Sequence, residues 1–185
     1  MNNTTHGAKV LVSAGSKHGS TAEIASRIAT RLAVSGMQAE TIDPEDVGDL
    51  TEYEAFVIGS AVYAGHWTKP ARSLALRIGD EKGDRPVWLF SSGPIGDPPK
   101  PEEDPVDVAQ VSEATNPEDH KIFSGKVDKS VLSFGERAIL VAVKASEGDF
   151  RDWTEIEAWA DGIAEALTSQ RVAAQEHSNE RIGAK

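Results

Sequence analysis

Short apolar runs punctuate the chain, and the segments between them show the spacing of helices. Within each run the apolar residues mostly follow one another instead of alternating with polar ones, which is typical of strands buried on both faces of a parallel sheet. The runs occupy residues 9–12, 38–42, 55–60, 87–92 and 121–125. The sequence therefore predicts five strands of a parallel sheet.

The segments between the runs repeat apolar residues at helical intervals. Residues 20–35 place Ile24 and Leu32 on one stripe, and residues 69–78 and 155–167 show the same spacing. Strands that alternate with helices over short connections predict a doubly wound α/β fold. Because such sheets bind ligands in the crevice outside the carboxyl ends of their strands, the loops after the strands are the first place to look for a site.

At 185 residues the chain is long enough for one domain with its own core. We expect this domain to span residues 8–167. An acidic, proline-rich insertion is predicted at residues 97–119, which contain eight acidic residues, one lysine, five of the nine prolines and a short helical pattern at 106–115. It is interpreted either as a solvated surface insertion or as a flap that narrows access to the site. Residues 168–185 have few large apolar side chains and are expected to form a frayed or disordered tail.

The chain has 19 Lys and Arg residues against 30 Asp and Glu residues, a formal net charge of −11. A nucleic-acid surface needs a basic stripe that displaces counterions, so this balance argues against nucleic acid as a partner. The absence of cysteine excludes disulfides and thiolate chemistry. The sequence shows neither an apolar run long enough to span a bilayer nor a signal peptide, so we expect a cytoplasmic protein.

Several other chemistries find no support in the sequence. The five histidines show no HxH or HExxH spacing and no GxSxG motif occurs, so neither a metal centre nor a serine hydrolase is predicted. The nearly all-apolar segment at residues 135–145 is interpreted as a buried helix in preference to a membrane or partner contact. The charged turn at residues 147–152 is assigned no chemistry.

The first loop, residues 15–21, reads GSKHGST and joins the first strand to the first helix. Backbone amides at a helix start favour an anion, because they and the helix dipole attract negative charge. The loop is neither a Walker motif nor GxGxxG. A capping box, in which Ser20 caps the helix and Glu23 reaches back, would explain those two residues. It leaves Ser16, Lys17 and the glycine pair without a role, so we favour a phosphate site.

The second loop, residues 59–71, brings Tyr63, His66 and Trp67 together around a glycine. Aromatic faces suit a flat ring, and each such contact is worth about 0.5–1.5 kcal/mol beyond burial. The simpler alternative is that these aromatic residues only cover the sheet edge. The third loop, residues 90–97, offers hydroxyls and glycines after the fourth strand. Together the loops predict a mononucleotide site, with phosphate in the first loop and a planar heterocycle between the other two.

Three motifs resemble those of one family. The stretches VSAGSKHGSTAEIA (residues 12–25), FVIGSAVYAGHW (56–67) and EGDFRDWTEIEAWADGIAEAL (147–167) are similar to the flavodoxin-like family of menaquinone-dependent protoporphyrinogen oxidases and their uncharacterised relatives. The resemblance implies a flavodoxin-like sheet of five parallel strands in the order 2-1-3-4-5 with helices on both faces. It also implies FMN as the cofactor, with its isoalloxazine ring between the second and third loops. The long acidic segment after the third loop departs from the oxidase pattern.

The resemblance also assigns the cofactor contacts by position. In the first loop these are Ser16, Lys17, His18, Gly19, Ser20 and Thr21. In the second loop they are Ser60, Ala61, Val62, Tyr63, Ala64, Gly65, His66 and Trp67. In the third loop they are Ser91, Ser92, Gly93, Pro94, Ile95 and Gly96.

Two functions of different class follow from this cofactor. One is an oxidoreductase that passes electrons between an organic substrate, with protoporphyrinogen IX as a candidate, and a quinone. The other is a non-catalytic electron carrier that docks on protein redox partners. A weaker third alternative is a domain that has lost its flavin and serves only for interaction. The sequence leaves the oligomeric state open.

Overall fold

A sheet of five parallel strands forms the centre of the protein. The computed structural model describes residues 7–63, 65–93, 105–131, 135, 137 and 147–183. The strands are β1 (Lys9–Gly15), β2 (Gln38–Thr41), β3 (Ala55–Tyr63), β5 (Val87–Ser92) and β6 (Asp119–Phe123). They lie in the order β2-β1-β3-β5-β6, and every neighbouring pair is parallel. This confirms the predicted α/β fold and its order 2-1-3-4-5, since β5 and β6 are the fourth and fifth parallel strands.

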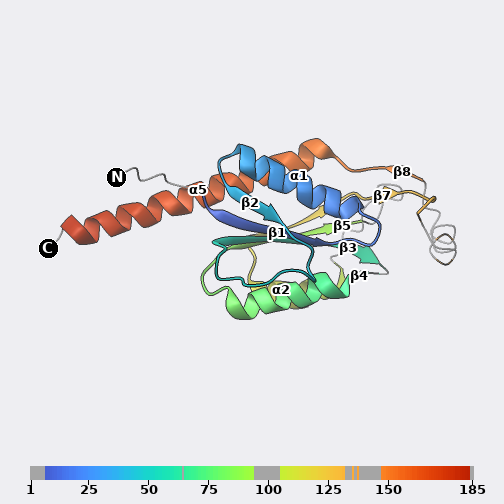
Figure 1. Cartoon of the computed structure of the whole chain (residues 1–185), viewed down its shortest axis with the longest axis horizontal. Helices are drawn as coiled ribbons and strands as arrows, with labels where there is room; N and C mark the ends of the chain where they lie inside the picture. Colours follow the sequence, from blue (N-terminus) through green and yellow to red (C-terminus); the bar gives the residue numbers. More distant parts are fainter. Residues whose placement is uncertain are drawn as a thin grey trace.

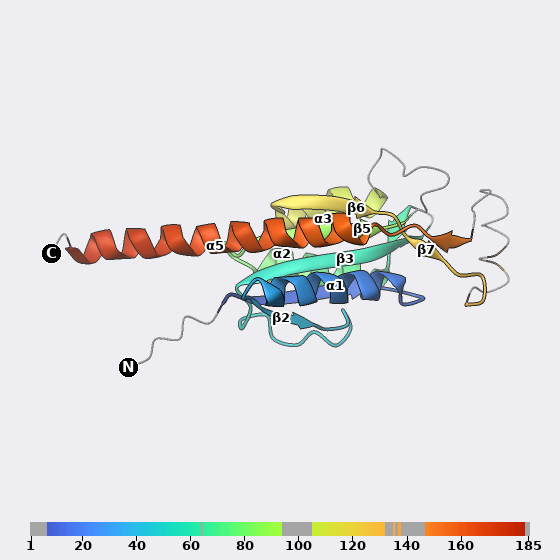
Figure 2. The ribbon, with the colours of Figure 1, turned by 90° about the horizontal axis from the view of Figure 1, so that it is seen from above.

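Helices cover both faces of this sheet (Figures 1 and 2). Helices α1 (Ser20–Val34) and α5 (Trp153–Gly183) pack on one face, and α2 (Lys69–Glu81) and α3 (Val106–Thr115) pack on the other. Each strand of the sheet centre is therefore buried on both sides, which explains why its sequence is continuously apolar.

The core beneath α5 centres on three aromatic rings from different elements. Phe90 of β5, Phe123 of β6 and Trp159 of α5 form tilted and T-shaped pairs, with ring centroids 5.6 to 6.1 Å apart. Gly59 of β3 makes room for them, because a Cβ atom at this position would lie 2.1 Å from Cζ of Phe90. The glycine that opens the second loop is therefore required by packing.

Helix α3 occupies residues 106–115 of the segment that the sequence predicted as an insertion at residues 97–119, and so confirms the short helical pattern expected there. Val108 and Val111 are 2% and 0% exposed and belong to the core beneath α2. The two helices approach so closely that a Cβ atom on Gly79 of α2 would lie 2.7 Å from the carbonyl oxygen of Ala114. The described part of the segment, from residue 105 onward, is thus a core helix and the start of β6 rather than a flap. Residues 97–104 lie outside the described residues.

The last helix is longer than the sequence predicted. We expected α5 to end at Leu167 and to give way to a frayed or disordered tail, but the helix continues to Gly183. Figure 2 shows this end projecting beyond the sheet. Residues 168–176 are largely exposed, so packing does not hold them. Their Ala, Gln, Arg and Glu content favours helix through backbone propensity, which the search for buried apolar stripes does not detect.

Two short antiparallel pairs lie beyond the carboxyl ends of the parallel strands. β4 (His66–Trp67) folds back on the end of β3, so that His66 lies opposite Tyr63. β7 (Lys126–Val127) follows β6 and pairs with β8 (Gly148–Asp149). Of the segment 135–145, for which the sequence predicted a buried helix, only residues 135 and 137 are described.

Two kinds of site find no support in the described part of the chain. None of the helices there combines the length and the apolar character that crossing a bilayer requires. No three His, Asp or Glu side chains there gather in a way that could hold a metal ion.

Candidate functional site

The three loops singled out in the sequence follow three adjacent strands. The ends of these strands are level in the sheet, because Gly15 of β1 is the register partner of Ser60 in β3, and Ser60 is the partner of Ser91 in β5. The first, second and third loops therefore meet at the carboxyl edge, where open α/β sheets bind their ligands. Ala64 and residues 94–96 lie outside the described residues.

The start of α1 is not capped by a side chain. Gly19 occupies the N-cap position in a left-handed conformation with φ 86°, and no side-chain hydrogen bond closes this end of the helix. The capping box considered for Ser20 and Glu23 is thus absent. The carboxylate of Glu23 instead accepts a hydrogen bond from Nη1 of Arg151 at 2.8 Å. The helix start therefore keeps backbone donors that a capping side chain would have used, and such donors favour an anion.

Thr21 provides the most informative observation at the first loop. Thr21 is 1% exposed, and its buried Oγ1 atom has no hydrogen-bond partner. Within the described part of the chain, only one other buried side-chain polar atom, Nε of Arg77, lacks a partner. A buried unpaired hydroxyl costs about 1–3 kcal/mol. An unpaired hydroxyl in the first turn of a helix without a side-chain cap is the feature expected of a loop that binds a phosphate.

Arg151 binds the start of α1, directly after the first loop. The sequence assigned no role to this residue, yet its side chain is only 3% exposed. Its guanidinium donates to the carbonyl oxygen of Ser20 at 3.1 Å and to both carboxylate oxygens of Asp149 at 2.8 and 2.6 Å. The hydrogen bond with Asp149 raises the pKa of Arg151 and lowers the pKa of Asp149. The guanidinium also lies 4.5 Å from the centroid of the Trp153 ring. This buried positive charge fixes the start of α1 to the start of α5.

The outer side of the second loop contacts the first loop through Tyr63. This side chain is 38% exposed. Nζ of Lys17 lies 5.6 Å from the centroid of its ring, and the His18 ring meets it edge-on at a centroid distance of 6.4 Å. The two loops that the sequence predicted to share one ligand are therefore in direct contact.

The inner side of the second loop is occupied by internal hydrogen bonds. Oγ of Ser60, which is fully buried, accepts a hydrogen bond from the Thr68 amide at 2.8 Å. Nε1 of the buried Trp67 donates to Oγ of Ser91 at 2.8 Å, and that oxygen lies 3.0 Å from Nε2 of His120. Three of the predicted cofactor contacts, Ser60, Trp67 and Ser91, thus hold the second and third loops to the sheet.

Asp107, in the first turn of α3, is a site residue that the sequence analysis missed. It is 6% exposed and accepts hydrogen bonds from the Trp67 amide at 3.0 Å and Nη1 of Arg72 at 2.9 Å. Its Oδ2 atom also lies 3.2 Å from Nδ1 of His66. Burial raises the pKa of Asp107, but these hydrogen bonds and the charge of Arg72 outweigh burial and lower its pKa below the ordinary value. The placement of this one acid between two valines was the available sequence signal.

The third loop begins with two buried serines. Ser92 is 4% exposed, and the amide of Gly93, which has φ 92°, donates to the carbonyl oxygen of Phe123 at 3.0 Å. The start of the third loop is thus anchored to β6. Its predicted contacts Pro94, Ile95 and Gly96 lie outside the described residues.

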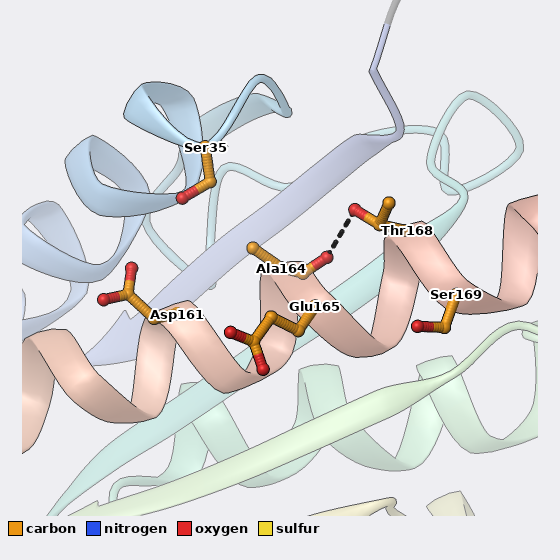
Figure 3. Close-up of a pocket in the computed structure, with 6 residues that line it drawn as sticks. All are labelled: Ser35, Asp161, Ala164, Glu165, Thr168 and Ser169. Carbon is orange, nitrogen blue, oxygen red and sulfur yellow. Dashed lines mark hydrogen bonds between the residues drawn. The ribbon is translucent and has the colours of Figure 1, made fainter.

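A separate hollow lies at the opposite end of α1 (Figure 3). It has a volume of about 510 Å³ and is lined by Ser35, Asp161, Ala164, Glu165, Thr168 and Ser169. The 15 residues of α1 separate it from the first loop by about 22 Å. The hydroxyl of Thr168 is bonded to the Ala164 carbonyl at 2.8 Å. Asp161 in this hollow is paired with Arg31, and the hollow lies away from the loops at the sheet edge, so the loops remain the candidate site.

Solved structures with the same fold include both enzymes and flavodoxins. The rubredoxin oxygen:oxidoreductase from the anaerobe Desulfovibrio gigas matches with a TM-score of 0.59 at 14% identity, over 87% of this chain and 36% of that one. A flavodoxin from the domain Archaea matches with 0.55 at 20% identity, over 86% and 99%. A flavone reductase matches with 0.57 at 12% identity, over 88% and 64%. This chain thus spans about a third of the first of these proteins, and the likenesses establish the fold.

The sequence comparison is more specific. A search among curated proteins gave no match. The model of one family, described as the flavodoxin domain, matches residues 11–154 and so includes β1, the three loops and the start of α5. A flavodoxin domain implies flavin binding, in agreement with the loop geometry above. On this match over most of its length, the chain belongs to the flavodoxin domain family.

Proposed function

We propose that this protein is an FMN-dependent redox protein that holds its cofactor across the three loops. The first loop, with Ser16 to Thr21, binds the phosphate, and the second and third loops flank the ring. When bound, FMN supplies hydride and single-electron transfer. The residues of the chain bind the cofactor, orient it and control what reaches it.

The unpaired hydroxyl of Thr21 is the observation that supports this proposal most directly. Oγ1 is buried beside the first turn of α1, where backbone amides point outward and no side chain caps the helix. A terminal phosphate satisfies both features at once, since it accepts hydrogen bonds from the hydroxyl and from the amides. The residues present therefore fit the phosphate of a mononucleotide.

The ring side of the site is supported by a smaller set of residues than the resemblance implied. Because Ser60, Trp67 and Ser91 already have internal partners, we propose that they shape the loops. The exposed side chains of Tyr63 and His66, together with the backbone around Gly65, then provide the contacts to the ring. The flat ring of Tyr63 offers a stacking face next to the phosphate loop.

We further propose that the protein transfers electrons between an organic substrate and a quinone, with protoporphyrinogen IX as a candidate substrate from the resemblance. A non-catalytic electron carrier is the second candidate. The net charge of −11 favours that alternative, because an acidic surface steers basic protein partners toward it.

The test of cofactor and phosphate uses the purified protein. We expect it to be yellow, or to become yellow with added FMN, and calorimetry should give an affinity for FMN at least 100-fold above that for riboflavin. Riboflavin is the matched ligand because it lacks only the phosphate. Equal affinities would overturn the phosphate site, and no binding of either flavin would overturn the proposed function.

A second measurement separates the enzyme from the carrier. The flavin-loaded protein is reduced under anaerobic conditions and mixed with quinones or with a basic redox protein. Rapid oxidation by quinones at a rate insensitive to salt supports the enzyme. Slow oxidation by quinones, with a fast protein reaction that weakens as salt increases, supports the carrier.

A further inference from the structure

His66 and Asp107 form a pair whose geometry determines which nitrogen of the imidazole is available. Nδ1 of His66 lies 3.2 Å from Oδ2 of Asp107. An ionised carboxylate only accepts hydrogen bonds, so the proton of this bond belongs to Nδ1. Nε2 is then the nitrogen that exchanges protons with whatever lies outside the loop.

Asp107 is held in the ionised state that this arrangement requires. Arg72 and the Trp67 amide donate to the same carboxylate at 2.9 and 3.0 Å. These donors keep the pKa of Asp107 low in spite of its burial. The carboxylate therefore does not take the proton of the imidazole but fixes the orientation of the ring through Nδ1.

The two members of the pair differ sharply in exposure. The Asp107 side chain is 8% exposed, whereas the His66 side chain is 56% exposed. A pair that served only to tie β4 to α3 would gain most if both groups were buried. That tie already exists without His66, because the Val106 amide donates to the Gly65 carbonyl at 2.9 Å and the Trp67 amide donates to Asp107. The imidazole is thus oriented by a buried acid while its outer edge stays open.

The position of His66 places this open edge at the ring side of the site. His66 lies opposite Tyr63 in the β3–β4 pair, so both side chains stand on the same face. Lys17 and His18 of the first loop lie close to the Tyr63 ring. Among the described residues, the charged and titratable groups linked to His66 are therefore Asp107 and, through it, Arg72. Tyr63 lies opposite His66 in the strand pair and connects it to Lys17 and His18 of the first loop.

We propose that His66 is a catalytic proton donor for the reduction of a quinone-type substrate at the flavin, with Asp107 as its positioning residue. This inference rests on the proposed function. A bound, reduced flavin would supply the hydride for one quinone oxygen, and the imidazolium of His66 transfers the proton on Nε2 to the other oxygen. The products are the quinol, oxidised FMN and neutral His66, which regains its proton from water.

The test compares two oxidants of the reduced, FMN-loaded protein in anaerobic stopped-flow measurements. A water-soluble benzoquinone needs a hydride and a proton, whereas ferricyanide takes single electrons and no proton. Because general acid catalysis contributes about 10²–10⁴-fold, we expect His66→Gln to slow the benzoquinone reaction at least 100-fold and to leave the ferricyanide reaction within about twofold. His177→Gln, near the far end of α5, is the matched control and should change neither rate.

Two kinetic outcomes would overturn the assignment. Equal benzoquinone rates for the wild-type protein and His66→Gln would exclude a proton donor at this position. An equal slowing with benzoquinone and ferricyanide would show that the substitution disturbs the flavin instead of proton transfer. Failure to bind FMN would overturn the proposed function itself and is recognised separately from the absorption spectrum.

A readout that is independent of turnover tests the orientation of the ring in the flavin-free protein. Nitrogen-15 NMR of the histidine side chains should show His66 with its proton on Nδ1 and with Nε2 unprotonated once the ring is neutral. A neutral His66 with its proton on Nε2 would contradict the role of Asp107. The thermal midpoint of His66→Gln should stay within about 2 °C of wild type, because the exposed ring contributes little to packing.

Discussion

The first and second loops lie against each other at the sheet edge but differ in how their polar atoms are paired. In the first loop, Oγ1 of Thr21 is buried without a partner and the helix behind it has no side-chain cap. In the second loop, Ser60 and Trp67 are buried and hydrogen-bonded within the protein. The first loop therefore keeps a polar atom without a partner, whereas the buried polar side chains of the second loop are paired within the protein.

Each loop is held by one charged side chain that comes from a distant part of the chain. Arg151, at the entry to α5, binds the start of α1 through Ser20 and Glu23. Asp107, at the entry to α3, binds the second loop through the Trp67 amide. Both are nearly buried, and both have further partners that keep them ionised. The site thus has a similar construction on both sides, although only the first loop keeps an unpaired buried hydroxyl for the ligand.

The largest expected effect is the loss of FMN affinity when the first loop loses its hydroxyls. Hydrogen bonds to charged groups are worth about 1.5–3 kcal/mol each, so Ser16→Ala with Thr21→Ala should weaken FMN binding by about 10²–10⁴-fold. Riboflavin binding should be nearly unchanged. Calorimetry with both flavins measures the difference.

The matched control for this pair is Ser26→Ala with Thr30→Ala on the exposed face of the same helix, where Thr30 bonds only to the Ser26 carbonyl. It should leave FMN binding as in wild type. A similar loss for FMN and riboflavin in the first-loop variant would contradict the difference drawn between the two loops.

The next effect concerns the support of the second loop. Asp107→Asn removes the charge that accepts hydrogen bonds from Arg72 and the Trp67 amide, so the free energy of unfolding should fall by about 1.5–3 kcal/mol. Denaturant unfolding of the flavin-free protein measures this loss. An unchanged free energy of unfolding would show that Asp107 does not support the loop.

This second effect should depend on pH in a defined direction. The pKa of Asp107 is lowered in the folded state, so its stabilising contribution is fully present above the ordinary aspartate value of about 4 and is lost as the pH falls below it. The gap in stability between wild type and Asp107→Asn should therefore close in acid. A gap that widened in acid would contradict the hydrogen bonds assigned to this carboxylate.

Smaller changes in stability, of opposite sign, are expected when two buried threonines are replaced by valine. Thr21→Val removes a hydroxyl that has no partner, so the flavin-free protein should become more stable by about 1–2 kcal/mol while its FMN affinity falls. Thr115→Val removes a hydroxyl that donates to the Val111 carbonyl at 2.7 Å, and stability should fall by about 0.5–1.5 kcal/mol. Thermal melts of both flavin-free variants give the comparison. Destabilisation by Thr21→Val would mean that its hydroxyl is paired within the protein.

The smallest effect is expected from the end of α5, which contacts neither loop. Deletion of residues 169–185 should change the free energy of unfolding by less than about 0.5 kcal/mol, because residues 169–176 are largely exposed. FMN binding should be unaffected. Loss of the cooperative melt would show that this end of the helix stabilises the domain.

The sequence by itself determined the sheet and predicted where in it a site would lie. Continuous apolar runs can be buried only between two layers of helices, so they specified a doubly wound fold with five parallel strands. The glycines and hydroxyls of residues 15–21 indicated a candidate binding loop after the first strand, because such residues do not stabilise a core strand or a core helix. Local composition was sufficient to predict the sheet, because burial on both faces requires continuous apolar runs of neighbouring residues.

Composition alone suggested a surface insertion at residues 97–119, whereas the helical pattern at 106–115 correctly predicted a helix there. Acids and prolines dominate residues 97–119, yet Val108 and Val111 bury a helix of the core there. In the last helix the opposite applies, because residues beyond Leu167 offer little to bury and still continue α5 to Gly183. Helix propensity therefore extends the end of α5, and packing against α2 stabilises α3.

Only the tertiary structure decided which candidate residues already have hydrogen-bond partners within the protein. Ser60 and Ser91 are the same residue type as Ser16. In the folded chain, however, the Thr68 amide donates to Ser60 and the Trp67 indole donates to Ser91. Likewise, nothing local shows that Arg151 reaches the first loop or that Asp107 orients His66. A hydrogen bond between residues 41 or 131 positions apart in the chain exists only after the sheet is assembled, so no local pattern could specify it.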